Sequence, residues 1–440
     1  MYRKEYTETI FRTGSHTSRK SSVKQHEMAA LREMEQMILA AEAVPAGAEA
    51  LERATAHLEQ FLQQVRQKRI LDEKQRAMEA FRQQFENGYT WRNGFLRNVA
   101  RFGDREALIE PESGTVWTYT QLNAEANRFS HALLRAGLQK GDVVMVQLHN
   151  CPEFVFAYLA CHKTGMVFCP VNFRLSAKEI TDCMDNSRPK VFLLEPETQA
   201  EVDMALRRTA HAPQILLTTD ARAAHAYAGF TADCPATEPE LPWELSVYDE
   251  TLRLFTSGTT GRQKSVCLTS INEVLSAHDV MIHFPFSFTD RSMNTTPWFH
   301  RGGLHSGGIT PTLYAGGTVI IQRKFQPEKT LDMVQQYGLT FLIGVPNVLE
   351  LLAEAQQKQP RDLSSLRGIV TMGSPLERAD CIRYQKILTK RIFNGYGTTE
   401  TFWNTFLRPD DLPEMAGSAG RSCVDDDVRC LLYTSDAADE

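Results

Sequence analysis

The spacing of apolar residues in 25–88 is typical of helices. Apolar side chains recur at steps of three and four from Leu51 onwards, which predicts one stripe of an amphipathic helix, and Gly88 is placed to cap its end. A Pro-Ala-Gly break before residue 48 separates this helix from an earlier one, expected at about 27–43. We therefore predict a helical hairpin extension with one apolar face, which packs on the rest of the protein or on a second copy of itself.

From residue 89 the pattern changes to short apolar runs that alternate with helical segments. Strand–helix alternation predicts an α/β fold, and near-continuous apolar strands are typical of parallel sheets buried on both faces. The expected strands lie at 143–148, 167–171, 191–194, 215–218, 252–255, 318–321, 341–344 and 368–371. The expected helices lie at 120–136, 152–163, 177–187, 271–282, 327–337 and 346–357.

Composition narrows the class of protein. The 440 residues suggest two to four structural units, and 42 % hydrophobic with 23 % charged residues is ordinary for a globular protein. The net charge of −6 argues against nucleic acid or an anionic membrane as the main partner. The nine cysteines form no CxxC pair, which favours free thiols in a reducing, cytoplasmic setting over a disulfide scaffold or zinc site.

Two stretches have to be weighed as a targeting peptide and as a transmembrane segment. Residues 1–24 hold six basic and two acidic side chains without an apolar core, which predicts a disordered arm; a transit peptide is the alternative. The most apolar stretch, 154–171, is interrupted by His162, Lys163 and Gly165. It therefore predicts a buried helix that leads into a strand, not a transmembrane segment.

The strongest chemical signal is the loop T-S-G-T-T-G-R-Q-K, which follows the apolar run 252–255. Its glycines allow a sharp turn that presents N–H groups, and hydroxyls and an ammonium surround them, so the loop is suited to wrap a polyphosphate. It is not a Walker motif, because two residues separate Lys264 from Gly261. A plain polar surface loop is the alternative. The candidate phosphate-binding residues are Thr256, Ser257, Gly258, Thr259, Thr260, Gly261 and Lys264.

A second signal is the string N-G-Y-G-T-T-E at residues 394–400. An aromatic ring such as Tyr396 can stack on a purine, and the hydroxyl of Thr399 can bind a phosphate oxygen. A carboxylate such as Glu400 can hold Mg²⁺ through oxygen.

Together the two strings resemble the signature motifs of the adenylate-forming enzymes, which include acyl-CoA synthetases, adenylation domains and luciferases. Further matching segments occur in the family's order at 170–175, 297–300, 344–346, 373–376 and 417–421. The resemblance covers about residues 89–429. It implies an AMP-binding N-terminal domain of stacked, largely parallel sheets flanked by helices, with a small β subdomain.

The resemblance also implies a reaction and roles. A carboxylate attacks the α-phosphorus of ATP to give an acyl-adenylate and pyrophosphate, and a thiol, usually that of coenzyme A, then displaces AMP. Lys264 and the loop hydroxyls are expected to hold the β- and γ-phosphates, Thr399 the α-phosphate and Glu400 the Mg²⁺. The candidate adenine site comprises Gly373, Ser374, Pro375, Tyr396, Gly397 and Thr398. The candidate acyl pocket comprises Trp298, Phe299, His300, Gly303 and Gly344, with His300 orienting the carboxylate or gating its entry.

Some neighbouring residues have two interpretations or depart from the family pattern. The Gly pairs at 302–303 and 307–308 leave room for an acyl tail or only allow close packing. His305 is interpreted as a packing residue, and Cys267 and Cys381 as small buried apolar residues. Gln263, Ser265 and Met372 depart from the family's usual Pro, Gly and Gly.

The end of the chain raises a separate expectation. Residues 430–440 resemble a translated sequencing-adapter read-through and are expected to be foreign to the fold. By the resemblance, a ribose-binding Asp and a C-terminal lid domain with its lysine would follow beyond residue 440. We therefore expect these 440 residues alone to adenylate poorly.

The leading prediction is an ATP-dependent fatty or aromatic acid–CoA ligase. One alternative is an adenylation domain that loads an acyl or aminoacyl group onto a carrier protein. The other is a nucleotide-binding pseudo-enzyme or scaffold that works through its helical extension. Lys264, Thr399 and Glu400 are all present, which argues against the pseudo-enzyme.

Overall fold

The computed structural model describes residues 48–257 and 263–429, together with single helical positions at 32, 36 and 40. The chain divides into two compact units, with the boundary between Phe81 and Arg82. The predicted arm 1–24, nearly all of the first hairpin helix and the tail 430–440 lie outside the described residues.

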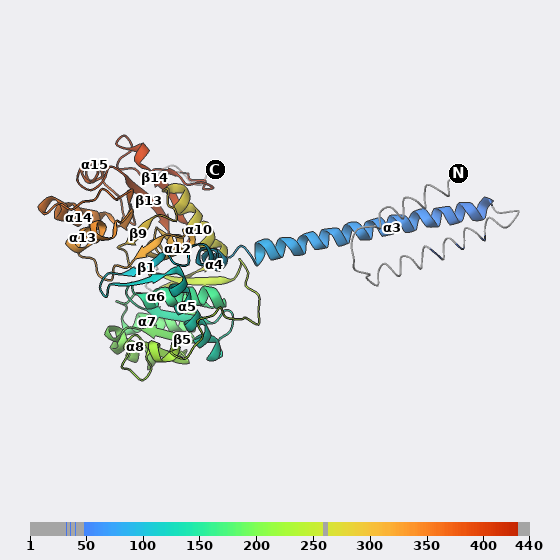
Figure 1. Cartoon of the computed structure of the whole chain (residues 1–440), viewed down its shortest axis with the longest axis horizontal. Helices are drawn as coiled ribbons and strands as arrows, with labels where there is room; N and C mark the ends of the chain where they lie inside the picture. Colours follow the sequence, from blue (N-terminus) through green and yellow to red (C-terminus); the bar gives the residue numbers. More distant parts are fainter. Residues whose placement is uncertain (1–31, 33–35, 37–39, 41–47, 258–262, 430–440) are drawn as a thin grey trace, which may run out of the picture. The chain divides into compact units, whose positions relative to one another are not determined.

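The described part of the first unit is one long helix, α3 (Ala48–Phe81), drawn in blue in Figure 1. The predicted helix is confirmed over this range, and Leu58, Phe61 and Val65 of the predicted stripe are half-buried. Over the whole of α3, however, the apolar side chains do not gather on one face. None of the helices in the described part of the chain has the length and apolarity that crossing a bilayer requires.

The predicted cap at Gly88 is wrong. Helix α3 ends at Phe81, a short π-helix (Arg82–Glu86) follows, and Gly88 is not among the glycines with positive φ. A Cβ at Gly88 would lie 2.7 Å from the carbonyl oxygen of Gln84. Glycine is needed there because of this close approach, not because of a left-handed cap.

The second unit contains two sheets, both largely parallel as predicted. The large sheet has the order β15-β14-β13-β12-β11-β9-β10-β1-β2, and the small sheet has the order β6-β5-β3-β4-β7-β8. The large-sheet strands are β1 (Glu106–Glu110), β2 (Thr115–Thr118), β9 (Arg291–Asn294), β10 (Thr318–Ile320), β11 (Phe341–Gly344), β12 (Gly368–Met372), β13 (Ile392–Thr398), β14 (Phe402–Leu407) and β15 (Arg421–Ser422). The small-sheet strands are β3 (Val143–Gln147), β4 (Val167–Pro170), β5 (Val191–Leu194), β6 (Ile215–Thr218), β7 (Glu250–Ser257) and β8 (Gln263–Thr269).

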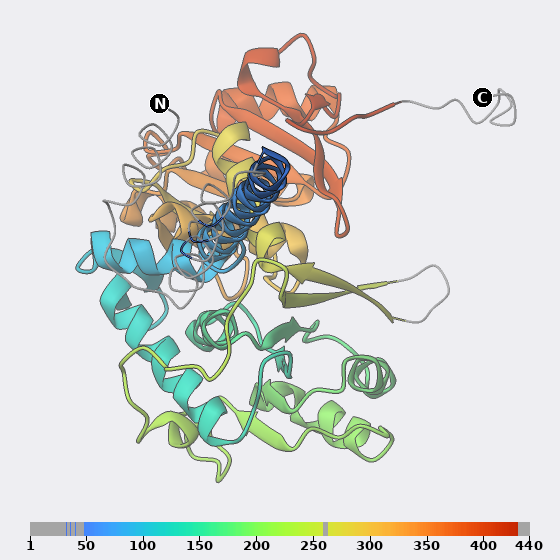
Figure 2. The ribbon, with the colours of Figure 1, turned by 90° about the vertical axis from the view of Figure 1, so that its right-hand side faces the viewer.

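Helices and sheets stack in five layers (Figures 1 and 2). Helices α13 (Pro327–Tyr337), α14 (Pro346–Lys358) and α15 (Arg378–Ile387) cover the outer face of the large sheet. Helices α7 (Ala177–Ser187) and α8 (Gln199–Leu206) cover the outer face of the small sheet. The layer between the sheets holds α4 (Trp91–Phe102), α5 (Tyr119–Arg135), α6 (Pro152–Thr164), α10 (Ser270–His283) and α12 (Ile309–Ala315), while the short α9 (Tyr227–Thr231) packs on α5.

The main apolar core lies in this middle layer. Leu108 of β1, Val144 of β3 and Phe154 of α6 are all buried in one cluster. Burial of each large apolar side chain contributes about 1.5–3 kcal/mol, so this cluster holds the two sheets at a fixed spacing. The apolar stretch around residues 154–171 is α6 followed by β4, as predicted, and His162 and Lys163 are buried inside it.

Antiparallel strands extend one end of the large sheet. Strands β13 and β14 pair antiparallel, as do β14 and β15. Within the described residues the strands form two sheets, so β14 and β15 belong to the large sheet and do not form a small sheet of their own.

Candidate active site

Four of the predicted motifs meet at one edge of the large sheet. Strands β9, β11, β12 and β13 run parallel, so their carboxyl ends share this edge. Residues 298–300 follow β9, Gly344 ends β11, residues 373–375 follow β12, and Tyr396 lies near the end of β13. Because β9 is flanked by β10 on one side and β11 on the other, the chain order reverses there, which is where open α/β sheets bind ligands.

The two halves of the candidate adenine site lie side by side. Met372 of β12 pairs with Gly395 of β13, so the turn that begins at Gly373 and the ring of Tyr396 leave neighbouring strands at the same level. Tyr396 is 57 % exposed and Gly373 has a φ of +83°. The exposed ring of Tyr396 beside this glycine turn can stack on a purine base.

Gly397 gives this surface its shape. A Cβ at this position would lie 1.4 Å from the carbonyl oxygen of Phe402, so β13 and β14 approach each other as closely as only glycine allows. Beyond it, Thr398 and Thr401 hydrogen-bond through their hydroxyls at 3.0 Å and brace the turn that carries Thr399 and Glu400.

The candidate acyl-pocket residues lie beside this surface. Trp298 is buried, Phe299 packs edge-on against Phe173 with ring centroids 5.5 Å apart, and His300 is exposed. Although His300 is exposed, the protein around it desolvates the ring in part and lowers its pKa, which favours the neutral imidazole.

Gly303 does not open onto this pocket. A Cβ there would lie 2.1 Å from the carbonyl oxygen of Pro297, and a Cβ at Gly308 would lie 2.0 Å from the carbonyl oxygen of Gly303. The structure therefore favours close packing as the reason for these glycines. At Gly302, in contrast, a Cβ would meet Met372 Sδ at 3.0 Å, which places the start of α11 (Arg301–His305) against the adenine-side strand.

The carboxyl edges of the two sheets are joined by Asn150, which the sequence analysis missed. Asn150 follows β3 of the small sheet, its Oδ1 accepts from the backbone N–H of Trp298 at 2.9 Å, and its Nδ2 donates to the carbonyl of Thr296 at 3.3 Å. The signal was present in the sequence, since a polar residue directly after a buried strand marks this edge.

The phosphate-loop candidates lie on the small sheet. Strand β7 runs parallel to β4, and Thr256 pairs with Lys264 across the β7–β8 hairpin, which extends from the body in Figure 2. Lys264 is exposed, and residues 258–262 lie outside the described residues. The phosphate contacts of this loop stay a prediction.

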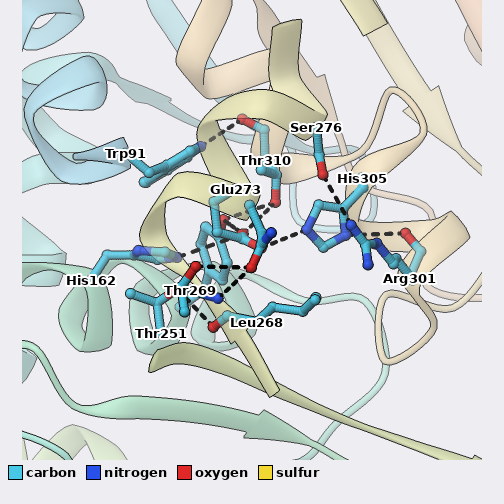
Figure 3. A network of polar contacts seen from close by, with 12 residues as sticks. Trp91, His162, Thr251, Leu268, Thr269, Glu273, Ser276, Arg301, His305 and Thr310 are labelled. Carbon is cyan, nitrogen blue, oxygen red and sulfur yellow. Dashed lines mark hydrogen bonds and ion pairs between the residues drawn. The ribbon is translucent and has the colours of Figure 1, made fainter. Parts of the chain in front are cut away.

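A buried polar network lies behind the site, between α6, α10, α11 and α12 (Figure 3). The carboxylate of Glu273 has no exposed surface; it accepts from His305 Nε2 at 2.7 Å and from the Tyr158 hydroxyl at 2.7 Å. Burial alone would raise the pKa of Glu273, but the His305 ring beside it, with further donors, lowers that pKa to about 2. Glu273 is therefore a buried anion at neutral pH.

Two further sequence interpretations are corrected. His305, interpreted as a packing residue, is fully buried but also has a polar role, because its Nε2 hydrogen-bonds to the Glu273 carboxylate at 2.7 Å. Cys267 is exposed on β8, whereas Cys381 is buried as expected. Burial and the neighbouring Glu250 raise the pKa of the Cys267 thiol, which disfavours a thiolate.

His162 gives the fold a dependence on pH. Burial lowers its pKa from 6.5 to about 4 even though Glu273 opposes the shift, so the folded protein holds the neutral ring while the unfolded chain takes up a proton below pH 6.5. The unfolding free energy should therefore fall by about 3 kcal/mol as pH drops from 6.5 to 4. Urea titrations over this pH range should show that the slope of the unfolding free energy against pH is smaller in His162→Gln than in the wild type, by the equivalent of about one proton. The exposed-residue variant His225→Gln is the control and should keep the wild-type slope. An unchanged slope in His162→Gln would contradict this assignment.

The residues at the edge fit a magnesium–nucleotide ligand. Mg²⁺ is usually held by one or two carboxylates together with substrate phosphates, so it needs no complete protein cage. Glu400 is exposed at the β13–β14 turn, and no three potential metal-binding side chains gather anywhere in the described residues. In addition, the buried Oδ1 of Asn394, two residues before Tyr396, has no hydrogen-bond partner in the described structure.

An exposed tyrosine ring, a glycine turn and an exposed carboxylate at the carboxyl edge of a parallel sheet are the features of a nucleotide-binding α/β protein. The comparison with protein families identifies the family. The AMP-binding enzyme family model matches residues 95–434, and the chain belongs to this family.

Individual relatives agree with this assignment. The chain is 31 % identical over 328 residues to an indoleacetate–CoA ligase of Aromatoleum aromaticum, covering 72 % of this chain and 63 % of that protein. It is 29 % identical to the long-chain-fatty-acid–CoA ligase FadD13 of Mycobacterium tuberculosis, covering 76 % and 65 %. The N-terminal domain of FACL13 from the same organism superposes with a TM-score of 0.69 at 25 % identity, covering 76 % of this chain and 83 % of that one. The chain thus spans less than two thirds of the length of these two ligases.

Proposed function

We propose that this protein activates a carboxylic acid with ATP to an acyl-adenylate and then forms a thioester with coenzyme A. The observation that supports it most is the convergence of the adenine-side turn, the Thr399–Glu400 turn and the His300 segment on one sheet edge in a chain of the AMP-binding family. The similar ligases act, by their names, on indoleacetate and on long-chain fatty acids. We therefore propose an aromatic or fatty acid as substrate.

In this proposal the main task is to bring two anions together. The Lys264 ammonium would neutralise the β- and γ-phosphates, and the Thr256 hydroxyl would hydrogen-bond to them. Thr399 would hold the α-phosphate and Glu400 would hold Mg²⁺, which when bound would supply further neutralising charge. Neutral His300 donates or accepts a hydrogen bond at the reacting carboxylate.

The test has two stages. Calorimetry should show that the protein binds MgATP, and pyrophosphate should be released only when an acid from a fatty and aromatic panel is present. Product analysis with CoA and with a carrier protein then identifies the acceptor. Absence of MgATP binding, or pyrophosphate release without an acid, would contradict the proposal.

We also propose a cytoplasmic location and self-association through the extension. Eight cysteines in the described chain are free, which fits a reducing compartment. On α3, Ile70, Leu71 and Met78 are each more than half exposed, and burial of these apolar side chains would favour pairing with a second copy. Light scattering that shows a monomer at all concentrations would contradict the second proposal.

A further inference from the structure

Arg301 links the two chemical segments of the site. It is the first residue of α11 and follows His300 directly, yet its own side chain is only 7 % exposed. One guanidinium nitrogen donates to the carbonyl oxygen of Thr399 and, at 3.5 Å, lies near that of Glu400. A second nitrogen donates to the Ser276 hydroxyl on α10 at 3.1 Å (Figure 3).

The guanidinium is also fixed from the other sides. It lies 5.2 Å from the ring centroid of Phe402, the first residue of β14. The main chain of Arg301 is tied to the buried network as well, because its carbonyl oxygen lies 3.3 Å from His305 Nδ1, and His305 pairs with Glu273. Three separate elements therefore determine where this cation lies.

Stability alone does not account for this arrangement. Burial lowers the pKa of Arg301 to about 10, with Glu273, Asp279 and Glu400 opposing the shift, so the group stays charged at neutral pH. Burying a cation is costly, and the Nε of Arg301 has no hydrogen-bond partner in the described structure. The contacts that it does make are with the turn that carries the candidate phosphate and Mg²⁺ ligands.

We propose that Arg301 is a positioning residue for the nucleotide site, one that orients Thr399 and Glu400 through their main-chain carbonyls. The Thr398–Thr401 hydrogen bond closes the base of the turn, while Arg301 fixes its tip. The exposed Glu400 carboxylate then points in one direction before Mg²⁺ binds. This inference rests on the proposed function of the same site.

Nucleotide binding with and without Mg²⁺ tests the proposal. We expect Mg²⁺ to strengthen the binding of a non-hydrolysable ATP analogue to the wild-type chain, and Arg301→Met to reduce that gain about tenfold or more, since it loses charge-assisted hydrogen bonds. Arg301→Lys keeps the charge with fewer donors and should fall between the two.

Arg105 offers a matched control. Its guanidinium donates to the carbonyl oxygen of Phe288 at 2.7 Å and lies 5.1 Å from the Phe102 ring centroid, so it makes the same kinds of contact far along the chain from the site. Arg105→Met should leave the Mg²⁺-dependent gain unchanged. If it reduces the gain as much as Arg301→Met does, the effect is general destabilisation and the proposal is overturned.

A double-mutant cycle separates positioning from a merely structural role. If Arg301 acts through Glu400, Arg301→Met should have little further effect on Mg²⁺-dependent binding in a Glu400→Gln background. Additive losses would overturn the proposal, and so would an unchanged gain in Arg301→Met. Should Arg301→Met fail to fold in thermal unfolding, Arg301→Lys carries the same cycle.

The outcomes also separate this inference from the proposed function. A wild-type chain that binds no magnesium nucleotide contradicts the proposed function, and the inference falls with it. A wild-type chain that binds it, with variants that bind equally well, overturns the role of Arg301 alone.

Discussion

Replacing Lys264 with alanine should lower acid-dependent pyrophosphate release by this protein about 10²–10³-fold. One preorganised donor or cation aimed at charge that develops in a transition state is typically worth this much. Lys264 is exposed on β8 opposite Thr256, so its removal should leave the fold intact. Glu400→Gln should lower the same rate and raise the Mg²⁺ concentration that the reaction requires, because a neutral amide holds the ion poorly.

Exposed residues of the same types serve as controls for these two variants. Lys178→Ala on α7 and Glu328→Gln on α13 remove the same charges away from the sheet edge. Both should keep the wild-type rate and unfolding midpoint. Wild-type rates in Lys264→Ala and Glu400→Gln would show that the two motifs do not form the active site.

Glu273→Ala should lower the free energy of unfolding by about 3–5 kcal/mol at neutral pH. Removing this buried carboxylate leaves buried donors without a partner, at about 1–3 kcal/mol each, because His305, Tyr158 and Thr310 all lose an acceptor. Glu273→Gln retains an acceptor and the side-chain volume, and should lose less.

The pH dependence of this loss tests the charge of Glu273. Its pKa is lowered from 4.5 to about 2 in the folded protein, so its stabilisation is present above pH 4.5 and is lost as pH falls towards 2. Urea titrations at pH 7 and pH 3 should therefore show a smaller difference between wild type and Glu273→Gln at the lower pH. The exposed Glu49, paired with Arg53 on α3, gives a control in Glu49→Gln. A difference that stays constant with pH would contradict a buried anion.

The sequence analysis predicted the strands and helices whose own residues carry an apolar pattern typical of buried elements. Strand β5 reads V-F-L-L and is buried on both faces, so its pattern alone identifies it. Strand β9 reads R-S-M-N and was not predicted. Its polar side chains are buried because they hydrogen-bond to residues outside the strand, which the strand's own sequence does not reveal. Ser292 donates to the carbonyl of Gly307, and Asn294 donates to those of Gly302 and Ser306.

The candidate site divides in the same way. The motif residues were named because their order along the chain is distinctive, and the strands bring several of them to one edge. Arg301, Asn150 and Glu273 were not named, since each works through partners distant in the sequence. Glu273 and His305 are 32 positions apart, and Asn150 and Trp298 are 148 apart, so no local pattern joins them.

The place of β1 in the large sheet has a consequence for biosynthesis. Strand β1 pairs with β10, and the Thr318 hydroxyl donates to the carbonyl of Glu106 across 212 positions of chain. At about 5–20 residues per second, the ribosome delivers β10 roughly 10–40 s after β1. During that interval Leu108 and Ile109, both buried in the finished protein, have no β10 to pair with, so we expect the nascent chain to expose an unpaired strand edge that is prone to aggregate.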